Sequence, residues 1–417
     1  MHSLPNPKFQ PSTNSMKHIE ISEVFKAQEV LKNVAVETPV TGPTELSDDC
    51  EVYLKAECLQ LTGSFKLRGA YYKISQLNDE EKKRGVIACS AGNHAQGVAL
   101  GATHNGIKSL ICLPTLAPLS KVEATKKFGA DICMVDGVYD DAYAKAVELK
   151  DKHKYTFIHP FNDPLVIAGQ GTIGLEILRQ LPEVEAVVVP VGGGGLISGV
   201  AFAIKTLRPD VKVYGVQSEG APSMKESLEK GKRVHLKNVS TIADGISVKE
   251  PGELTFEMCR KYVDKIVTVS DDEVAAAILA LMEKQKMVSE GAGAVAVAAV
   301  LFKKLPVKGK KVVCLVSGGN IDVNTLNRVI TRGLVRSGRV VALTLDLPDK
   351  PGVLAEISGI IADLGGNVIS VIHERSSNFS SINGCSLHIE METRNHEHVE
   401  EIKKHLQEAG YPILRSY

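Results

Sequence analysis

The sequence predicts an α/β protein, in which a large unit built on a mostly parallel sheet is followed by a small βαββαβ module. From about residue 17 to 330, short β-branched runs alternate with longer amphipathic stretches, as strands and helices do around such a sheet. Most strand-like runs end in Gly, Ser, Pro or Asp. After residue 339 the pattern changes, and apolar and polar residues alternate, as in Leu343–Leu347, which indicates a small antiparallel sheet covered on one face.

Length, charge and cysteine usage narrow the classes of function. The 417 residues are enough for two or three domains. Lys plus Arg and Asp plus Glu are 49 each, so no net charge attracts nucleic acid or a membrane surface, and we expect small-molecule ligands. The eight cysteines form no C-x-x-C pair, which favours a reducing cytoplasm over a disulfide framework or a zinc site. Residues 1–16 are predicted to be a disordered tail, and no apolar run is long enough to span a membrane.

The predicted elements follow in order along the chain. Strands of the large unit are expected at 85–90, 109–114, 130–135, 186–191, 212–217 and 311–317. A basic stretch, 328–339, is expected to be a helix that stops at Gly338. The small module then reads as strand 341–347, helix 353–364, strands 367–375 and 385–393, helix 396–409 and a short terminal strand. Because ligands of open α/β sheets bind at the carboxyl ends of strands, the motifs that close the strands of the large unit should converge.

The first such motif is Gly63–Ala70, which places Lys66 between a small polar residue and an aromatic ring just before a helix. A solvated surface lysine is the ordinary interpretation of one lysine alone. Three further motifs, Ser90–His94, Gly192–Gly195 and Ser317–Asn320, each follow a strand-like run. Because these motifs occur together with Lys66, we expect one shared site in which Lys66 is a Schiff-base lysine.

The four glycines at 192–195 lie between a strand and a helix start. Their backbone N–H groups and the positive end of the helix can hold a phosphate without any basic side chain. A flexible turn is one alternative. A dinucleotide site is another, but the G-x-G-x-x-G spacing is missing, and Gln217 and Ser218 stand where the acidic residue would follow the next strand.

The other two motifs also have two readings each. Small residues around Ser90 and His94 at a helix start suit a substrate carboxylate beside a cofactor ring, although Ser90 is equally suited to be a helix N-cap. Ser317 ends an apolar strand before two glycines. It can donate a neutral hydrogen bond there, or simply belong to a turn.

Five motifs in order resemble the signature set of the fold-type-II pyridoxal-phosphate enzymes, specifically the threonine and serine dehydratases. They are Gly63–Ala70, Ser90–Gly97, the glycine run with Leu196, Ala243–Ile246 and Ser317–Asn320. The resemblance implies two open, twisted α/β subdomains within a catalytic domain at 17–330, with the smaller subdomain inserted at about 85–162. After a linker at 331–339, residues 340–417 are similar to an ACT regulatory domain through the segments 349–354 and 365–368.

The resemblance also implies roles for particular residues. Lys66 would bind pyridoxal 5'-phosphate covalently and remove the Cα proton of the substrate. Around the cofactor, Phe65 would pack near the ring, Asn93 would hydrogen-bond its phenolic oxygen and Ser317 would meet its pyridine nitrogen. The phosphate would be held by Gly192, Gly193, Gly194, Gly195 and Leu196. The substrate would be held by Ser90, Ala91, Gly92, Asn93, His94 and Gly245.

The implied activity is that of a lyase, β-elimination from L-threonine to give 2-oxobutanoate and ammonia, with side activity on L-serine giving pyruvate. The alternatives are a dehydratase that prefers L-serine, an amino-acid sensor with an inert dehydratase-like domain, and a nicotinamide-dependent oxidoreductase. Serine racemases are similar but carry a serine where Ala91 stands and acidic metal ligands where Gln217 and Ser223 stand. We therefore expect neither strong racemisation nor a divalent metal site of that kind. Binding of a monovalent cation is left open by the sequence.

The ACT-like module has no catalytic constellation of its own. Its turn at Pro351 and Gly352, with the facing Asn367, would present backbone groups to isoleucine, valine or another small effector, with two such modules pairing in a homo-oligomer, a dimer or tetramer. Pure scaffolding is the alternative. A response to isoleucine or valine would indicate isoleucine biosynthesis, and its absence would indicate threonine breakdown.

Overall fold

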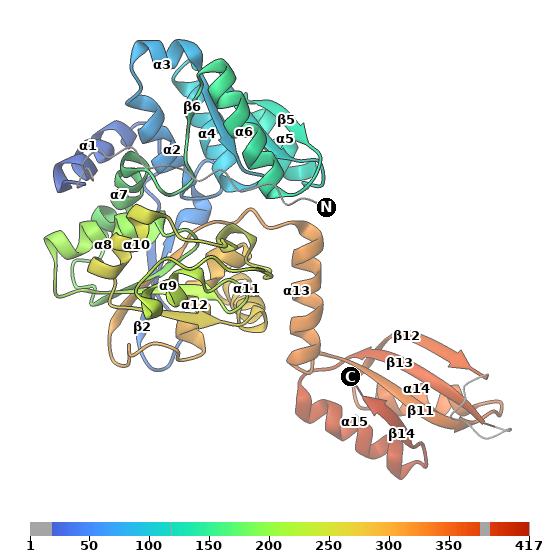
Figure 1. The fold of residues 1–417 in the computed structure, drawn as a ribbon. Helices are drawn as coiled ribbons and strands as arrows, with labels where there is room; N and C mark the ends of the chain where they lie inside the picture. Colours follow the sequence, from blue (N-terminus) through green and yellow to red (C-terminus); the bar gives the residue numbers. More distant parts are fainter. Residues whose placement is uncertain (1–18, 118, 376–383, 417) are drawn as a thin grey trace. The chain divides into compact units, whose positions relative to one another are not determined.

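The computed structural model describes residues 19–117, 119–375 and 384–416 (Figure 1). The chain divides into two compact units, Met1–Asp322 and Val323–Tyr417. The tail expected at residues 1–16 lies outside the described residues. The expected linker at 331–339 is, in the structure, the end of helix α13 (Val323–Arg336) and the turn that follows it. This helix groups with the second unit, and His396 Nε2 lies 2.9 Å from the Arg336 carbonyl oxygen at its end.

A six-stranded sheet in the order β1-β2-β10-β7-β8-β9 forms the base of the first unit. Its strands are β1 (Val40–Thr44), β2 (Glu51–Ala56), β7 (Ala186–Pro190), β8 (Lys212–Ser218), β9 (Lys265–Val269) and β10 (Lys311–Val316). Only the edge pair β1 and β2 is antiparallel, and β10 runs parallel to both of its neighbours. The central strands are rich in valine because helices cover both faces of the sheet.

A four-stranded parallel sheet in the order β5-β4-β3-β6 forms the smaller subdomain of the same unit. Its strands are β3 (Val86–Cys89), β4 (Ser109–Pro114), β5 (Asp131–Val135) and β6 (Thr156–Phe157). The six strands predicted from the sequence are all present, within one residue at each end. The prediction did not name β1, β2, β6 or β9.

Helices pack on both faces of the two sheets. Those of the first unit are α1 (Ile21–Leu31), α2 (Lys66–Ser75), α3 (Asp79–Arg84), α4 (Asn93–His104), α5 (Leu119–Lys127), α6 (Tyr139–His153), α7 (Pro164–Gln180), α8 (Gly195–Leu207), α9 (Ser223–Lys230), α10 (Glu253–Tyr262), α11 (Asp271–Gln285) and α12 (Gly291–Leu301), with the 3-10 turns η1 (Glu57–Leu59) and η2 (Asp244–Ile246). Local sequence sets several boundaries. For example, Asp163 Oδ1 accepts the N–H groups of Leu165 and Val166 at the start of α7.

The second unit is the predicted βαββαβ module, preceded by α13. Its elements are β11 (Val340–Pro348), α14 (Val353–Asp363), β12 (Asn367–Glu374), β13 (Gly384–Glu392), α15 (His396–Glu408) and β14 (Ile413–Ser416). The sheet order is β12-β13-β11-β14, and all pairs are antiparallel. Leu343, Leu345 and Leu347 alternate into a core shared with α14 and α15, as the sequence pattern predicted.

In the part of the chain that the structure describes, none of the helices combines the length and the apolar character that crossing a lipid bilayer requires.

Candidate active site

Lys66 is the first residue of α2, and its side chain is half-buried. Its Nζ donates a hydrogen bond to the Pro160 carbonyl oxygen at 2.9 Å. Burial lowers the pKa of the Lys66 amine to about 8, although the charge of Glu290 opposes the shift. The neutral amine, which is the nucleophilic and basic form, is therefore accessible near physiological pH.

Backbone pairing joins the Lys66 motif to the end of strand β10. Ser64 and Gly318 form an antiparallel bridge, and the Phe65 N–H donates to the Ser317 carbonyl oxygen at 3.1 Å. Ser317 is almost fully buried, and its Oγ is 3.4 Å from the Ala292 carbonyl oxygen. Because that distance is long for a hydroxyl donor, the Ser317 proton is only weakly engaged. The two motifs thus meet, as the sequence predicted from their strand ends.

Asn93 brings the third motif to the same place. It begins α4 at the end of β3, and its Nδ2 donates to Glu290 Oε1 at 2.6 Å. Its Oδ1 accepts from Asn320 Nδ2 at 2.8 Å. Ser90 is not the helix N-cap, because Gly92 holds that position, and Ser90 Oγ instead accepts the Gly92 N–H at 3.1 Å. The second N–H of the Asn93 amide stays available to a ligand.

His94 contributes no positive charge to the site. Its ring is buried, and Nε2 donates to the Ile158 carbonyl oxygen at 2.8 Å. Burial and the neighbouring Lys66 charge lower the pKa of His94 to about 3. The imidazole is therefore neutral, and a substrate carboxylate at this turn would be met by N–H groups rather than by an imidazolium.

The glycine run closes β7 and opens α8, which begins at Gly195. A Cβ atom on Gly193 would lie 2.5 Å from the Phe161 ring, and one on Gly195 would lie 2.8 Å from Phe161 atoms. Thr255 Oγ1 donates to the Gly193 carbonyl oxygen at 2.6 Å, so that carbonyl is already engaged. The first N–H groups of α8 have no partner within the helix. Phe161 directly follows the Pro160 carbonyl that binds Lys66, so one segment joins the loop to the lysine.

Gly245 lies in η2, where a Cβ atom would be 3.0 Å from the Ala292 Cβ. Beside it, Lys121 of α5 forms an ion pair with Asp244 at 2.5 Å. This pair joins the smaller subdomain to the segment expected to face the substrate. Ala91 and Gly92 are half-buried and lie shortly after the end of β3.

Two family models match the chain. The model described as pyridoxal-phosphate dependent enzyme matches residues 32–318, and the ACT domain model matches residues 341–410. An L-threonine ammonia-lyase of Thermotoga maritima is 53% identical over 397 residues, which is 95% of this chain and 99% of the relative. The chain belongs to the threonine ammonia-lyase family of pyridoxal-phosphate enzymes.

Solved structures of similar proteins extend the comparison to the fold. The processed form of threonine deaminase isoform 2 from Solanum lycopersicum is 42% identical, with a TM-score of 0.70 over 75% of this chain and 94% of that one. A maize serine racemase is 35% identical, with a TM-score of 0.71 over 76% of this chain and 98% of that one. The fold-type-II architecture and the C-terminal ACT domain predicted from the sequence are confirmed.

The chain's own residues fit pyridoxal 5'-phosphate, the cofactor of this family. The glycine run leaves the start of α8 without side chains, which suits a phosphate held by backbone N–H groups. The Lys66 amine and the buried Ser317 hydroxyl lie on paired backbone segments. The amine would supply a covalent anchor for the aldehyde, and the hydroxyl would supply a neutral hydrogen-bond donor for the pyridine nitrogen.

Glu290 is a site residue that the sequence prediction missed. It is the N-cap residue of α12 and almost fully buried. Burial, and next the charge of Asp244, raise the pKa of the Glu290 carboxyl to about 7, while Lys121, Asn93 and Lys66 oppose the shift. A Cβ atom on Gly318 would lie 2.5 Å from Glu290 Oε1, so this carboxyl packs directly on the Ser317 turn. A glutamate immediately before a helix of small residues was the only available signal.

His159 was also missed. Its Nδ1 accepts the N–H groups of Phe161 and Asn162 at 3.2 and 2.9 Å. Burial lowers the pKa of His159 to about 4 despite the opposing charge of Asp163. The neutral ring therefore carries its proton on Nε2, and it shapes the turn that packs on both the glycine run and Lys66.

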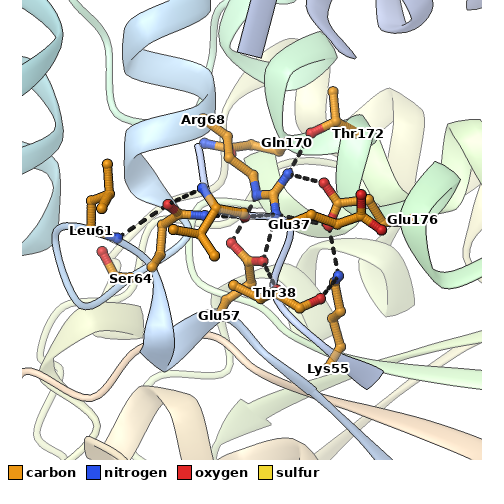
Figure 2. A network of polar contacts seen from close by, with 12 residues as sticks. Glu37, Thr38, Lys55, Glu57, Leu61, Ser64, Arg68, Gln170, Thr172 and Glu176 are labelled. Carbon is orange, nitrogen blue, oxygen red and sulfur yellow. Dashed lines mark hydrogen bonds and ion pairs between the residues drawn. The ribbon is translucent and has the colours of Figure 1, made fainter. Parts of the chain in front are cut away.

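A buried ionic network holds the helix that begins with Lys66 (Figure 2). The Arg68 guanidinium lies between two carboxylates, donating to Glu57 through Nε and Nη2 at 2.8 Å and to Glu176 through Nη1 at 2.5 Å. Lys55 Nζ also donates to Glu176, at 2.6 Å. Two cations and two anions thus compensate one another and tie α2 to β2, η1 and α7.

The second unit contains a cavity of about 380 Å³ at its β11–α14 turn. Pro351 and Gly352 are among its lining residues, together with Asp349, His373 and Arg375. Asn367 does not line this cavity. It lies at the start of β12, where its Nδ2 donates to Glu392 Oε2 at 2.8 Å.

Proposed function

We propose that the chain catalyses the elimination of water and ammonia from L-threonine to give 2-oxobutanoate, and that it also converts L-serine to pyruvate. The single observation that carries the proposal is that the Lys66 motif pairs with the Ser317 motif through the backbone, while the glycine run packs on Phe161, next to the Pro160 carbonyl that binds Lys66. It occurs in a chain matched over nearly its whole length by a relative named L-threonine ammonia-lyase.

Lys66 is the residue that moves the proton in this proposal. When bound, pyridoxal phosphate supplies an electron sink that acidifies the Cα–H bond of an amino acid joined to it. The Lys66 amine has its pKa lowered to about 8, so its neutral form can take that proton at Nζ. The Pro160 carbonyl accepts a hydrogen bond from Nζ at 2.9 Å and fixes the direction of the amine.

Ser317 favours elimination over transamination. A carboxylate at the pyridine nitrogen would keep that nitrogen protonated, whereas a hydroxyl leaves it largely neutral. The buried Ser317 Oγ is a neutral group, so negative charge at Cα is only moderately stabilised. Prompt departure of the β-hydroxyl is then favoured over transamination.

Asn93 and the turn around it would orient the substrate. The amide is fixed by Glu290 on one side and Asn320 on the other, which reduces the entropy lost when a ligand accepts its remaining N–H. The Ser90 hydroxyl and the backbone around His94 stand at the same strand end, where the Gly92 N–H holds Ser90 Oγ in place. They are suited to the substrate carboxylate, with His94 neutral.

Racemisation is expected to be weak. Ala91 offers no proton-carrying group at the face opposite Lys66, although serine racemases share the fold. Gln217 and Ser223 are both buried, and Gln217 Oε1 accepts the Lys225 N–H at 2.8 Å. This neutral pair supports no strong divalent metal site.

The proposal extends to regulation and location. The ACT domain would bind isoleucine, valine or another small amino-acid effector in the cavity beside Pro351 and Gly352, within a homo-oligomer working in the cytoplasm. An isoleucine response would place the enzyme in isoleucine biosynthesis. Asn367 is a weaker candidate than the cavity residues because its side chain is bound to Glu392.

The test is the initial rate of 2-oxo acid formation from L-threonine and from L-serine by the holoenzyme. Lys66→Ala should abolish both rates, whereas Lys83→Ala, which alters an exposed lysine on α3, should leave them unchanged. Faster turnover of serine would favour the serine-preferring alternative. If neither substrate yields a 2-oxo acid from protein that contains cofactor, the elimination is refuted and a sensor becomes the better explanation.

A further inference from the structure

Three different metal-ligating side chains meet in the second unit. One oxygen of Asp349, one ring nitrogen of His373 and the sulfur of Cys385 all lie within 4.8 Å of one another. The three come from separate segments: the turn after β11, the end of β12 and the start of β13. They belong to a domain to which the catalytic proposal assigns no chemistry.

The register of the sheet places these side chains together. Cys385 pairs with Leu347 of β11, and His373 pairs with Leu387 of β13. Because residues two apart on a strand share a face, His373 and Cys385 lie diagonally on one face of neighbouring strands. Asp349 follows two residues after Leu347, just beyond the end of β11. The cluster is therefore fixed by backbone pairing.

The donor set selects a class of metal. Thiolate, imidazole and carboxylate together are ligands of Zn²⁺ and related transition ions. Calcium and magnesium prefer sets made of oxygen alone. Three protein ligands leave one position of a tetrahedral ion open.

The distances suit an ion between the side chains. His373 Nε2 and Asp349 Oδ1 are 4.0 Å apart, which is beyond a direct hydrogen bond. Ligand bonds of about 2.0–2.3 Å place neighbouring atoms of a tetrahedral zinc site about 3.5 Å apart. A shift of roughly half an ångström would therefore bring these two atoms to zinc.

Arg375 supplies the outer support that ligating carboxylates usually have. Its Nε lies 2.8 Å from Asp349 Oδ2, while its Nη2 is 3.3 Å from Oδ1. The shorter contact therefore holds Oδ2, whereas Oδ1 is the oxygen that pairs with His373. The arginine thus orients the carboxylate and leaves Oδ1 as the better ligand atom.

The cluster is also accessible. All three residues line the cavity of about 380 Å³, whose apolar wall includes Leu347, Val353 and Leu387. His373 and Asp349 are exposed, whereas Cys385 is buried beneath them. An ion can therefore enter from the cavity, and a further ligand can reach its open position.

We propose that Asp349, His373 and Cys385 form a Zn²⁺ site with one open coordination position in the ACT domain. On binding, the Cys385 thiol releases its proton to solvent and no electron is transferred. The ion would bind in the cavity also proposed for the effector, but the zinc proposal does not rest on threonine turnover, so either of these two can fail without the other.

The experiment uses the full-length holoenzyme, freed of metal by a chelator and titrated with Zn²⁺ against a competing indicator. We expect one Zn²⁺ per chain. His373→Ala and Cys385→Ser should each weaken binding by more than the roughly 10- to 100-fold that loss of an outer partner costs, and Arg375→Ala should weaken it by about 10-fold. His388→Ala, which removes another partly exposed histidine of the same sheet, is the matched control and should bind as the wild type does.

Co²⁺ provides a second readout, because tetrahedral Co²⁺ has visible ligand-field bands that report thiolate and imidazole ligation. These bands should be present in the wild type and in His388→Ala and absent from His373→Ala. His373 is exposed, so its replacement tests the site even if Cys385→Ser disturbs the core. Equal zinc affinity in all variants, or no zinc retained by the wild type, would overturn the proposal and leave Asp349 and Arg375 as a structural ion pair.

Discussion

Glu290→Gln tests the electrostatics of the active site most directly. The glutamine keeps a carbonyl oxygen that can accept the hydrogen bond from Asn93 Nδ2, now 2.6 Å from Glu290 Oε1, but it cannot ionise. The Glu290 carboxyl is almost fully buried, and burial with the charge of Asp244 raises its pKa to about 7. Ionising this carboxyl in the folded protein therefore destabilises the wild type, and Glu290→Gln lacks this destabilisation.

The magnitude follows from the pKa. A change from 4.5 in the unfolded chain to about 7 in the folded protein, at 1.36 kcal/mol for each pH unit, amounts to about 3 kcal/mol. Below pH 4.5 the carboxyl is protonated in both the folded and the unfolded state, so it makes no contribution to the pH dependence of stability. Between pH 4.5 and 7 the folded state holds a proton that the unfolded state has lost, so the stability of the wild type falls as pH rises. Above pH 7 the full cost is present.

The assay is equilibrium urea unfolding of the wild type and the variant, followed by circular dichroism at pH 5 and pH 8. The unfolding free energy of Glu290→Gln, relative to the wild type, should be higher at pH 8 than at pH 5 by up to about 3 kcal/mol. Glu229→Gln, which changes an exposed glutamate on α9, should show no comparable difference. A relative stability of Glu290→Gln that does not depend on pH would refute the assignment of a costly buried carboxylate.

Three further predictions concern the cofactor and the framework. Gly193→Ala should weaken pyridoxal-phosphate binding in a fluorescence titration, because the added Cβ would lie 2.5 Å from the Phe161 ring. Gly359→Ala, whose added Cβ would meet nothing within 4 Å, is the control, and an unchanged affinity of Gly193→Ala would contradict the prediction. Arg68→Met should lower the free energy of unfolding in urea by about 3–5 kcal/mol, because it leaves buried carboxylates uncompensated. A loss under about 1 kcal/mol, the size expected for an exposed ion pair, would contradict this prediction. Recombination of apoenzyme with cofactor, followed by absorbance, should accelerate as pH rises through about 8, where Lys66 loses its proton; a flat profile would exclude the neutral amine as nucleophile.

The sequence predicted the framework well because strong local patterns specified it. The runs at 186–191 and 311–317 are the buried strands β7 and β10, and each predicted boundary is within one residue of the observed one. Valine-rich runs of that length in an α/β protein are typical of buried parallel strands. The convergence of Lys66, Asn93 and Ser317 was equally predictable. Each stands where a strand or a helix start meets the carboxyl edge of a sheet.

The charge states of the site were not predictable from the sequence. Glu290 follows no strand and precedes a helix of small residues, so its position gives no sign that it packs on Gly318 and Asn93. His159 resembles any loop histidine until its two backbone N–H partners are seen. The depth of burial, which decides each of these pKa values, comes from segments far away in the sequence.

Burial acts in one direction on four ionisable groups of the candidate site. It lowers the pKa of Lys66, His94 and His159 and raises that of Glu290, so each group is driven toward its neutral form. The buried charged groups nearby, such as Arg68 with Glu57, are held in a network in which each charge is compensated. A pocket with weak fixed charge is compatible with a neutral serine at the pyridine position, since a buried carboxylate there would itself need a partner. In the proposed mechanism, the neutral environment and Ser317 would both limit the charge at Cα and so favour early loss of the leaving group.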